Sequence, residues 1–397
     1  MAEYPIFVFM ALLILAYGLF SKLSERSVIT APMVCVTIGI LASLLPYSLL
    51  KEGVNATLVR VLAELTLVMV LFLDASTINR KELMKERQLP IRLLFIGLPL
   101  TMLAGFLLAV PLFPGMNLWV LLLMALILSP TDAALGVAVV TSKRVPAKIR
   151  QTINVESGLN DGIALPLILI CFAALSETSA SGSGFTYWAL FILKQFIYGP
   201  LIGGAVGWLG GLLVERSARR EWMNPTFQSL SAIALAVLAF SFAEMIHGNG
   251  FIAAYFAGLM LGTQTRSVRE RLHEFGESES QALVLVIFLL FGMILVPLAF
   301  PLWDWQSWIY ALLSLTVIRM VPVAISLAGT KLPWSTVGFI GWFGPRGIAS
   351  ILYLLLVILE LETAGYERMI SVIVLTVFLS VFLHGLTANP LTRLYHE

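Results

Sequence analysis

The sequence predicts an all-α polytopic membrane protein, and three observations lead to that prediction. Of its 397 residues, 59% are hydrophobic and only 12% are charged, with a mean hydropathy of +0.93. A soluble domain carries about 25% charged residues. Apolar runs of about 20 residues, the length with which a helix crosses the hydrocarbon core of a bilayer, recur along the whole chain.

These runs predict about thirteen transmembrane helices. The ninth is short, and its boundary with the eighth, at residues 247–250, is the hardest to place. The expected spans are residues 5–21, 30–50, 57–76, 90–110, 117–141, 152–175, 186–214, 226–246, 249–264, 281–300, 306–329, 334–359 and 369–390.

The distribution of lysine and arginine predicts the orientation. If the N-terminus lies outside, the loops on the cytoplasmic side hold 19 of the 25 basic residues and the outer loops hold three. Basic residues concentrate in the cytoplasmic loops of membrane proteins. We therefore expect a plasma (inner) membrane protein with its N-terminus outside and its C-terminus cytoplasmic. The first run lacks a basic leader and is expected to be a retained span, and no large cytoplasmic domain is expected after the last one.

Two of the expected spans are interrupted near their middle. Pro130 lies in the fifth span and Pro345 in the twelfth, each beside a charged residue. Proline removes a backbone donor and breaks the helix, and one such break alone is often only a kink. Two breaks at corresponding places in two halves favour an inverted repeat, with spans one to six matching spans eight to thirteen and a site near the midplane.

The stretch Glu156–Gly162 places polar and ionisable groups inside the sixth span. Such groups are expensive in a membrane and mark ion or proton paths by default. Ser157 and Asp161 are four residues apart and share a helix face, and Glu156 and Asn160 share the neighbouring face.

A small monovalent cation needs oxygen ligands, and four residues are expected to supply them: Asp161, Asp132, Thr131 and Ser157. Burial favours the protonated form of an aspartate, and a bound cation favours the ionised form. A proton and a cation would therefore compete for Asp161, which suffices for exchange. The alternatives are a structural salt bridge at Asp161 and a helix cap at Asp132.

Other polar residues are expected to support this site. Arg346 in the second break needs a counter-ion, and we expect Glu156 to pair with it and to tie the two half-bundles together. Arg319, deep in the eleventh span, is expected near Asn160 or Asp132.

Asp74, near the cytoplasmic end of the third span, is either a funnel acid or an interface residue.

The sequence also argues against other classes of function. Ser157 has no histidine near it in the sequence, so no enzyme is expected. The net charge of +2 does not predict nucleic-acid binding. The two cysteines, Cys35 and Cys171, do not have the spacing of a metal or cofactor site. The four histidines do not have it either.

Three motifs carry a resemblance that covers essentially the whole chain. They are Pro130-Thr131-Asp132-Ala133, the stretch Glu156–Gly162 and Gly344-Pro345-Arg346-Gly347. With them the sequence resembles the monovalent cation/proton antiporters of the NhaP and NHE type. The resemblance implies an NhaA-like antiporter fold in which the two broken helices cross in a six-helix core.

The resemblance further implies a homodimer embedded in membrane lipids. It assigns residues 90–176 and 304–397 to the transport core, residues 1–89 to dimerisation, and residues 177–303 to a linker span and dimerisation. It makes Asp161 the carboxylate that binds both ion and proton. Asn160, in place of a second aspartate, implies electroneutral exchange of one Na+, Li+ or K+ for one H+ through an elevator-like movement.

Two alternatives remain open at this point. An inverted-repeat transporter could bind an organic anion with Arg346 and the N-termini of the half-helices. A channel or a receptor without transport activity is the other. The sequence does not decide between Na+, Li+ and K+.

Overall fold

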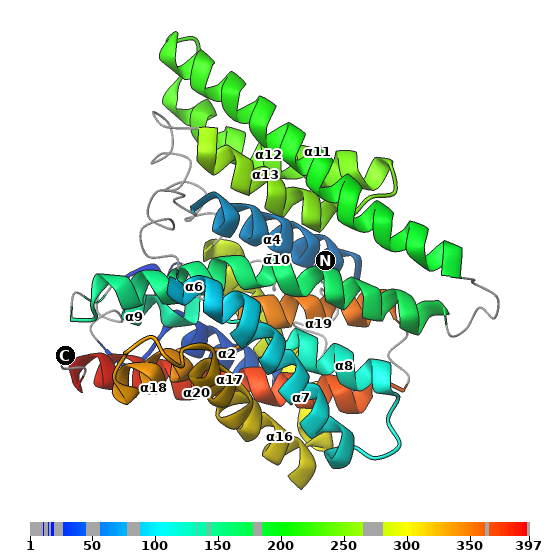
Figure 1. Cartoon of the computed structure of the whole chain (residues 1–397), viewed down its shortest axis with the longest axis vertical. Helices are drawn as coiled ribbons and strands as arrows, with labels where there is room; N and C mark the ends of the chain where they lie inside the picture. The colour runs from blue at the N-terminus through cyan, green and yellow to red at the C-terminus, as the bar shows by residue number, and fades with distance from the viewer. Residues whose placement is uncertain are drawn as a thin grey trace. The chain divides into compact units, whose positions relative to one another are not determined.

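In the part of the chain that the computed structural model describes, all regular secondary structure is helical (Figure 1). That part comprises residues 11, 15, 17–19, 27–44, 56–77, 88–132, 134–140, 142, 144–177, 185–264, 281–361 and 365–394. The expected span at residues 5–21 lies almost entirely outside it. The prediction of an all-α protein is confirmed for the described residues.

Seven of the described helices are long and apolar enough to cross a membrane, and four shorter apolar helices accompany them. The seven are Gln88–Leu112, Ala147–Leu175, Ile197–Arg219, Pro225–Met245, Gln281–Leu302, Trp305–Ser326 and Glu367–Arg393. The shorter ones are Ala31–Ser43, Leu118–Ile127, Gly250–Gly262 and Ile348–Leu359. These helices confirm a multi-pass membrane protein.

The chain divides into two compact units. Unit 1 comprises Met1–Ala63, Gln88–Asn160 and Ala282–Glu397, and unit 2 comprises Glu64–Arg87 and Asp161–Gln281. The division falls inside two helices, α4 (Ala56–Thr77) and α10 (Ala147–Glu177). The expected division into transport and dimerisation domains concerns movement and assembly and stays a prediction.

Unit 1 is built around α20, which packs against α8, α16 and α19. Its described helices are α2 (Ala31–Ser43), α6 (Gln88–Arg92), η1 (Leu93–Gly97), α7 (Leu98–Leu112), α8 (Leu118–Ile127), η2 (Ala134–Gly136), α9 (Val137–Val140), η3 (Phe291–Leu295), α15 (Val296–Ala299), η4 (Phe300–Leu302), α16 (Trp305–Leu315), α17 (Val317–Ser326), α18 (Trp334–Trp342), α19 (Ile348–Glu360) and α20 (Glu367–Leu394).

Both expected helix breaks are present in unit 1. α8 ends at Ile127, residues 128–132 are not helical, and η2 begins at Ala134. α18 ends at Trp342, and α19 begins at Ile348 after five non-helical residues. Each gap contains one of the two prolines singled out in the sequence, which remove backbone donors where the helix would otherwise continue.

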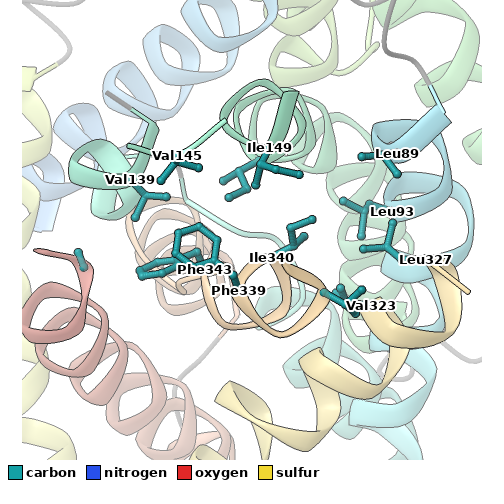
Figure 2. Close-up of a cluster of buried hydrophobic side chains, with 13 residues drawn as sticks. Leu89, Leu93, Val139, Val145, Ile149, Val323, Leu327, Phe339, Ile340 and Phe343 are labelled. Atoms are coloured by element: carbon teal, nitrogen blue, oxygen red, sulfur yellow. The ribbon is translucent and has the colours of Figure 1, made fainter. Parts of the chain in front are cut away.

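A cluster of buried apolar side chains holds the beginning of α10 in unit 1. Figure 2 shows Ile149 of α10 facing Ile340 of α18, with Leu89 and Leu93 on one side and Val139 and Val145 on the other. Burying one such side chain stabilises a fold by about 1.5–3 kcal/mol. The cluster therefore fixes the helix that carries Glu156 and Ser157 against the helix that leads into the second break.

Unit 2 contains α11 (Phe185–Arg219), α12 (Pro225–Met245) and α13 (Gly250–Gln264), which pack on one another. The boundary between the eighth and ninth spans falls where it was expected, between α12 and α13. Asn249 caps α13 by accepting from the Ile252 amide at 2.9 Å, and the Glu244 carboxylate accepts from the Gly250 amide at 2.8 Å. These polar caps let two separate helices form where a single hydropathy peak is ambiguous.

Two glycines let α11 and α13 approach closely. A Cβ at Gly203 would lie 2.0 Å from the Ala253 carbonyl oxygen, and one at Gly207 would lie 2.2 Å from the Ala257 carbonyl oxygen. Small residues four apart are a common way for membrane helices to pack backbone against backbone.

Candidate functional site

The two helix breaks meet through three hydrogen bonds within unit 1. The Asp132 amide donates to the Pro345 carbonyl at 2.9 Å, and the Ile348 amide donates to Asp132 Oδ2 at 2.6 Å. The Ser350 hydroxyl donates to the Ile127 carbonyl, which belongs to the end of α8, at 2.8 Å. Each break thus supplies partners for backbone groups that the other has left without a helical partner.

Asp132 caps the N-terminus of α19, the second half of the other broken helix. This geometry fits the alternative of a capping role, although the helix concerned is not the one that follows Asp132 in sequence. The positive end of a helix dipole favours a carboxylate at this place. Gly347 makes room for it, because a Cβ there would lie 1.9 Å from Asp132 Oδ2.

Thr131, Ser157 and Asn160 form one buried polar group. The Thr131 and Ser157 hydroxyls are 3.1 Å apart. Asn160 Nδ2 donates to the Thr131 hydroxyl at 2.7 Å and to the Thr131 carbonyl at 3.1 Å. Asn160 Oδ1 has no hydrogen-bond partner among the described residues. The amide therefore fixes the first break to α10 and leaves hydroxyl and amide oxygens concentrated at one place.

Asp161 follows Asn160 on α10, four residues after Ser157, and is only 4% exposed. It belongs to unit 2, where α10 packs against Tyr255 of α13: a Cβ at Gly162 would lie 2.4 Å from the tyrosine ring. Half-buried Asp74 of α4 also belongs to unit 2. Unit 2 thus contains both the expected ion-binding aspartate and the expected funnel acid.

The expected pairing of Glu156 with Arg346 is wrong. Arg319 of α17 donates from Nη1 to Glu156 Oε1 at 2.6 Å and from Nη2 to Oε2 at 2.8 Å, and both side chains are buried. Arg319 reaches α10 by passing over Gly344, where a Cβ would lie 2.4 Å from its Nε. A glycine in the second break thus leaves room for Arg319 to reach the carboxylate.

Arg346 instead turns back onto its own break. Its Nη1 donates to the Gly344 carbonyl at 2.8 Å, and its backbone amide donates to the Ser380 hydroxyl of α20 at 2.7 Å. The side chain is completely buried, and its Nε and Nη2 have no hydrogen-bond partner among the described residues. Arg346 therefore braces the non-helical segment and is not the counter-ion of Glu156.

Sequence reasoning missed Ser350 and Ser380 in unit 1 and Tyr255 in unit 2. Each is a hydroxyl residue in an apolar span, and hydroxyl side chains are common in membrane helices. Nothing in the sequence distinguishes them from the other hydroxyl side chains of these spans.

Comparisons with known proteins agree with this architecture. The profile of the family described as "Sodium/hydrogen exchanger, transmembrane" matches residues 8–394. The K(+)/H(+) antiporter NhaP of Alkalimonas amylolytica is 26% identical over 274 residues, an alignment covering 68% of this chain and 46% of that protein. The Na(+)/H(+) antiporter NhaP of Pseudomonas aeruginosa is 25% identical over 292 residues, covering 68% of this chain and 65% of that protein. The chain thus spans less than two thirds of either relative.

The solved structure of the sodium proton antiporter MjNhaP1 from Methanocaldococcus jannaschii has a similar fold. The TM-score is 0.76, the sequence identity is 18%, and the match covers 99% of both chains. At this identity the likeness bears on the fold alone, and it confirms the predicted antiporter fold with its broken helices.

Proposed function

Because the chain belongs to the sodium/hydrogen exchanger family, we propose that it is a secondary antiporter that exchanges Na+, Li+ or K+ for H+. The observation that carries the proposal is the buried group of Thr131, Ser157 and Asn160 beside the capping carboxylate of Asp132. Oxygen atoms concentrated at two helix breaks in an apolar bundle are suited to a small cation.

Asp161 is the carboxylate that the cation and the proton share in this mechanism. It lies on α10 one turn after Ser157 and is buried, so an empty ionised form is costly. Either a proton or a cation removes that cost. The transport domain then changes access only when Asp161 carries one or the other, which couples the two fluxes.

The other polar residues hold the site and do not carry the exchanged charge. Asn160 donates its amide hydrogens to Thr131, and Glu156 and Arg319 neutralise each other. Asp132 has one oxygen committed to the amide of Ile348. One exchanging carboxylate implies one monovalent cation for one proton, and therefore electroneutral exchange.

The proposal includes the assembly and placement expected from the sequence. The protein is a homodimer in the plasma (inner) membrane, with its N-terminus outside and its C-terminus cytoplasmic. Residues 90–176 and 304–397 form the core that moves, and residues 1–89 and 177–303 provide the linker span and the dimerisation domain. Asp74 on α4 serves as an acid on the cytoplasmic path to Asp161.

The organic-anion alternative has less support. It needs the N-terminus of a half-helix to be available for a substrate carboxylate. Asp132 already provides a carboxylate at the N-terminus of α19 and accepts from its first amide at 2.6 Å.

Cation-driven proton movement in proteoliposomes tests the proposal. A pH-sensitive dye would report exchange by wild-type protein and by Asp161→Asn, with the membrane potential clamped and unclamped. We expect Na+, Li+ or K+ to move protons only in the wild type, at a rate that ignores the clamp. Full exchange by Asp161→Asn would refute the role of Asp161, and sensitivity to the clamp would refute electroneutrality.

A further inference from the structure

His384 is a buried histidine of α20 that closes a chain of hydrogen bonds around the second break. Its Nε2 lies 2.9 Å from the carbonyl oxygen of Trp342, the last residue of α18. Its Nδ1 lies 3.1 Å from the hydroxyl of Ser380, one turn earlier on α20. The Ser380 hydroxyl in turn accepts from the Arg346 amide at 2.7 Å.

The partners limit where the protons lie in this network. The Trp342 carbonyl can only accept, so Nε2 of His384 donates to it. Nδ1 has two neighbours on Ser380, the hydroxyl at 3.1 Å and the backbone carbonyl at 3.0 Å. The Ser380 hydroxyl oxygen accepts from the Arg346 amide and is also bonded to Nδ1, whichever of these two atoms donates.

A single peptide group connects these hydrogen bonds to the candidate cation site. The peptide between Pro345 and Arg346 donates its N–H to Ser380, and its C=O accepts from the Asp132 amide at 2.9 Å. Because a peptide group is planar and rigid, the two hydrogen bonds cannot change independently. The position of Ser380 therefore fixes the orientation of the carbonyl that holds Asp132.

We propose that Ser380 and His384 are positioning residues for cation binding, which act on Asp132 through the peptide between Pro345 and Arg346. His384 holds the end of α18 and orients Ser380, and Ser380 holds the start of the segment that leads to α19. The inference rests on the proposed function, since it assigns these residues to the same cation site.

Four variants in proteoliposomes test the inference: His384→Ala, His384→Gln, Ser380→Ala and Thr387→Val. Thr387 is the matched control, because it lies on the same helix and makes none of the hydrogen bonds that link the His384 side chain, Ser380 and Asp132. Its hydroxyl accepts from the Trp342 indole at 3.0 Å and donates to the backbone carbonyls of Leu383 and His384. The measurement is the apparent KM for the cation beside the maximal rate of exchange.

We expect His384→Ala and Ser380→Ala to raise the apparent KM about tenfold, because each leaves a buried hydrogen-bonding group without its partner. The maximal rate should change much less. His384→Gln should recover most of the affinity, since its amide nitrogen can still donate to the Trp342 carbonyl. Thr387→Val should leave the apparent KM at the wild-type value.

The outcomes separate this inference from the proposed function. If wild-type exchange depends on Asp161 but both alanine variants keep the wild-type KM, only the inference fails. An equal rise of KM in Thr387→Val, or no recovery in His384→Gln, would mean that these residues merely support packing. Absence of exchange by the wild type would overturn the proposed function and this inference with it.

Discussion

Arg319 and Glu156 form a bidentate salt bridge, with nitrogen–oxygen distances of 2.6 and 2.8 Å, and both side chains are almost fully buried. The pair joins α17 to the part of α10 that belongs to unit 1, and the two segments are far apart in the sequence. In a low-dielectric interior, the attraction compensates for desolvation only when the geometry is good. The stability of the pair therefore depends on both partners being present.

Removing one partner of this pair should destabilise the protein strongly. Arg319→Gln leaves the Glu156 carboxylate buried without its counter-charge, and we expect a loss of about 3–5 kcal/mol of unfolding free energy. Glu156→Gln with Arg319→Gln leaves no charge behind and should be less destabilised than either single variant. Thermal unfolding of the purified protein in detergent measures both. A double variant less stable than Arg319→Gln would contradict the account.

A methyl group at Gly347 should disrupt the junction of the two breaks. The added Cβ would lie 1.9 Å from Asp132 Oδ2, and the carboxylate would have to leave the α19 cap. We expect Gly347→Ala to lose most cation exchange and about 1–2 kcal/mol of stability, since that is the cost of losing a good helix cap. Gly338→Ala in α18 is the control, because a Cβ added there would have nothing within 4 Å of it. If Gly347→Ala and Gly338→Ala lost the same amount of exchange activity and stability, the close contact between Gly347 and the Asp132 carboxylate would not matter for either.

Much of the fold could be predicted from the sequence, because hydropathy and proline act locally. Both breaks, at Pro130 and Pro345, and the split between α12 and α13 fall where they were expected. The partner of Glu156 could not be predicted in this way. It depends on the rotation of α17 and on the missing side chain of Gly344, which are properties of packing between distant segments.

The same limit applies to the polar residues that surround the site. The sequence identified Thr131 and Ser157 through their motifs, and the structure places their hydroxyls together. It did not identify Ser380, because α20 carries several serines and threonines and the sequence does not show which of them meets another segment. Only the meeting of α20 with the second break gives that residue a partner.

The ion pair between Asp304, at the start of α16, and Arg368, at the start of α20, should make the stability of unit 1 depend on pH. Burial raises the pKa of Asp304, but hydrogen bonds from Ser307 and the nearby Arg368 guanidinium outweigh it, so the pKa lies below its ordinary value of 3.8. A lowered pKa means that the stabilisation is present above the ordinary value and is lost as the pH falls through the folded-state pKa. We expect the Tm to fall between pH 5 and pH 3 by an amount that includes about 1–2 °C from this pair.

Asp304→Asn isolates that contribution. Asparagine keeps the N-cap of α16, where Asp304 accepts from the Ser307 amide at 2.8 Å, and removes only the charge. The variant should therefore show a smaller fall in Tm over the same pH range, whereas Asp304→Ala should be less stable at every pH. If Asp304→Asn and the wild type lose the same number of degrees, the pair with Arg368 does not contribute to the pH dependence.

Exchange by the Asn160→Asp variant should remain electroneutral, because the residue at this position serves as a hydrogen-bond donor. Asn160 donates at 2.7 and 3.1 Å to the hydroxyl and the carbonyl of Thr131, and a carbonyl cannot donate in return. An aspartate would have to keep its proton to replace the bond to the carbonyl, so it would not release a proton in each cycle. We expect slower exchange that is still insensitive to a clamp of the membrane potential. The rate should fall further as the pH rises, when ionised Asp would repel the Thr131 carbonyl.

Asn160→Ala loses the same bonds without adding an acid, so its rate should fall without that additional pH dependence. Exchange by Asn160→Asp that responds to the clamp would mean that position 160 can carry a transported proton, and the assignment of Asp161 as the single exchanging carboxylate would have to be revised.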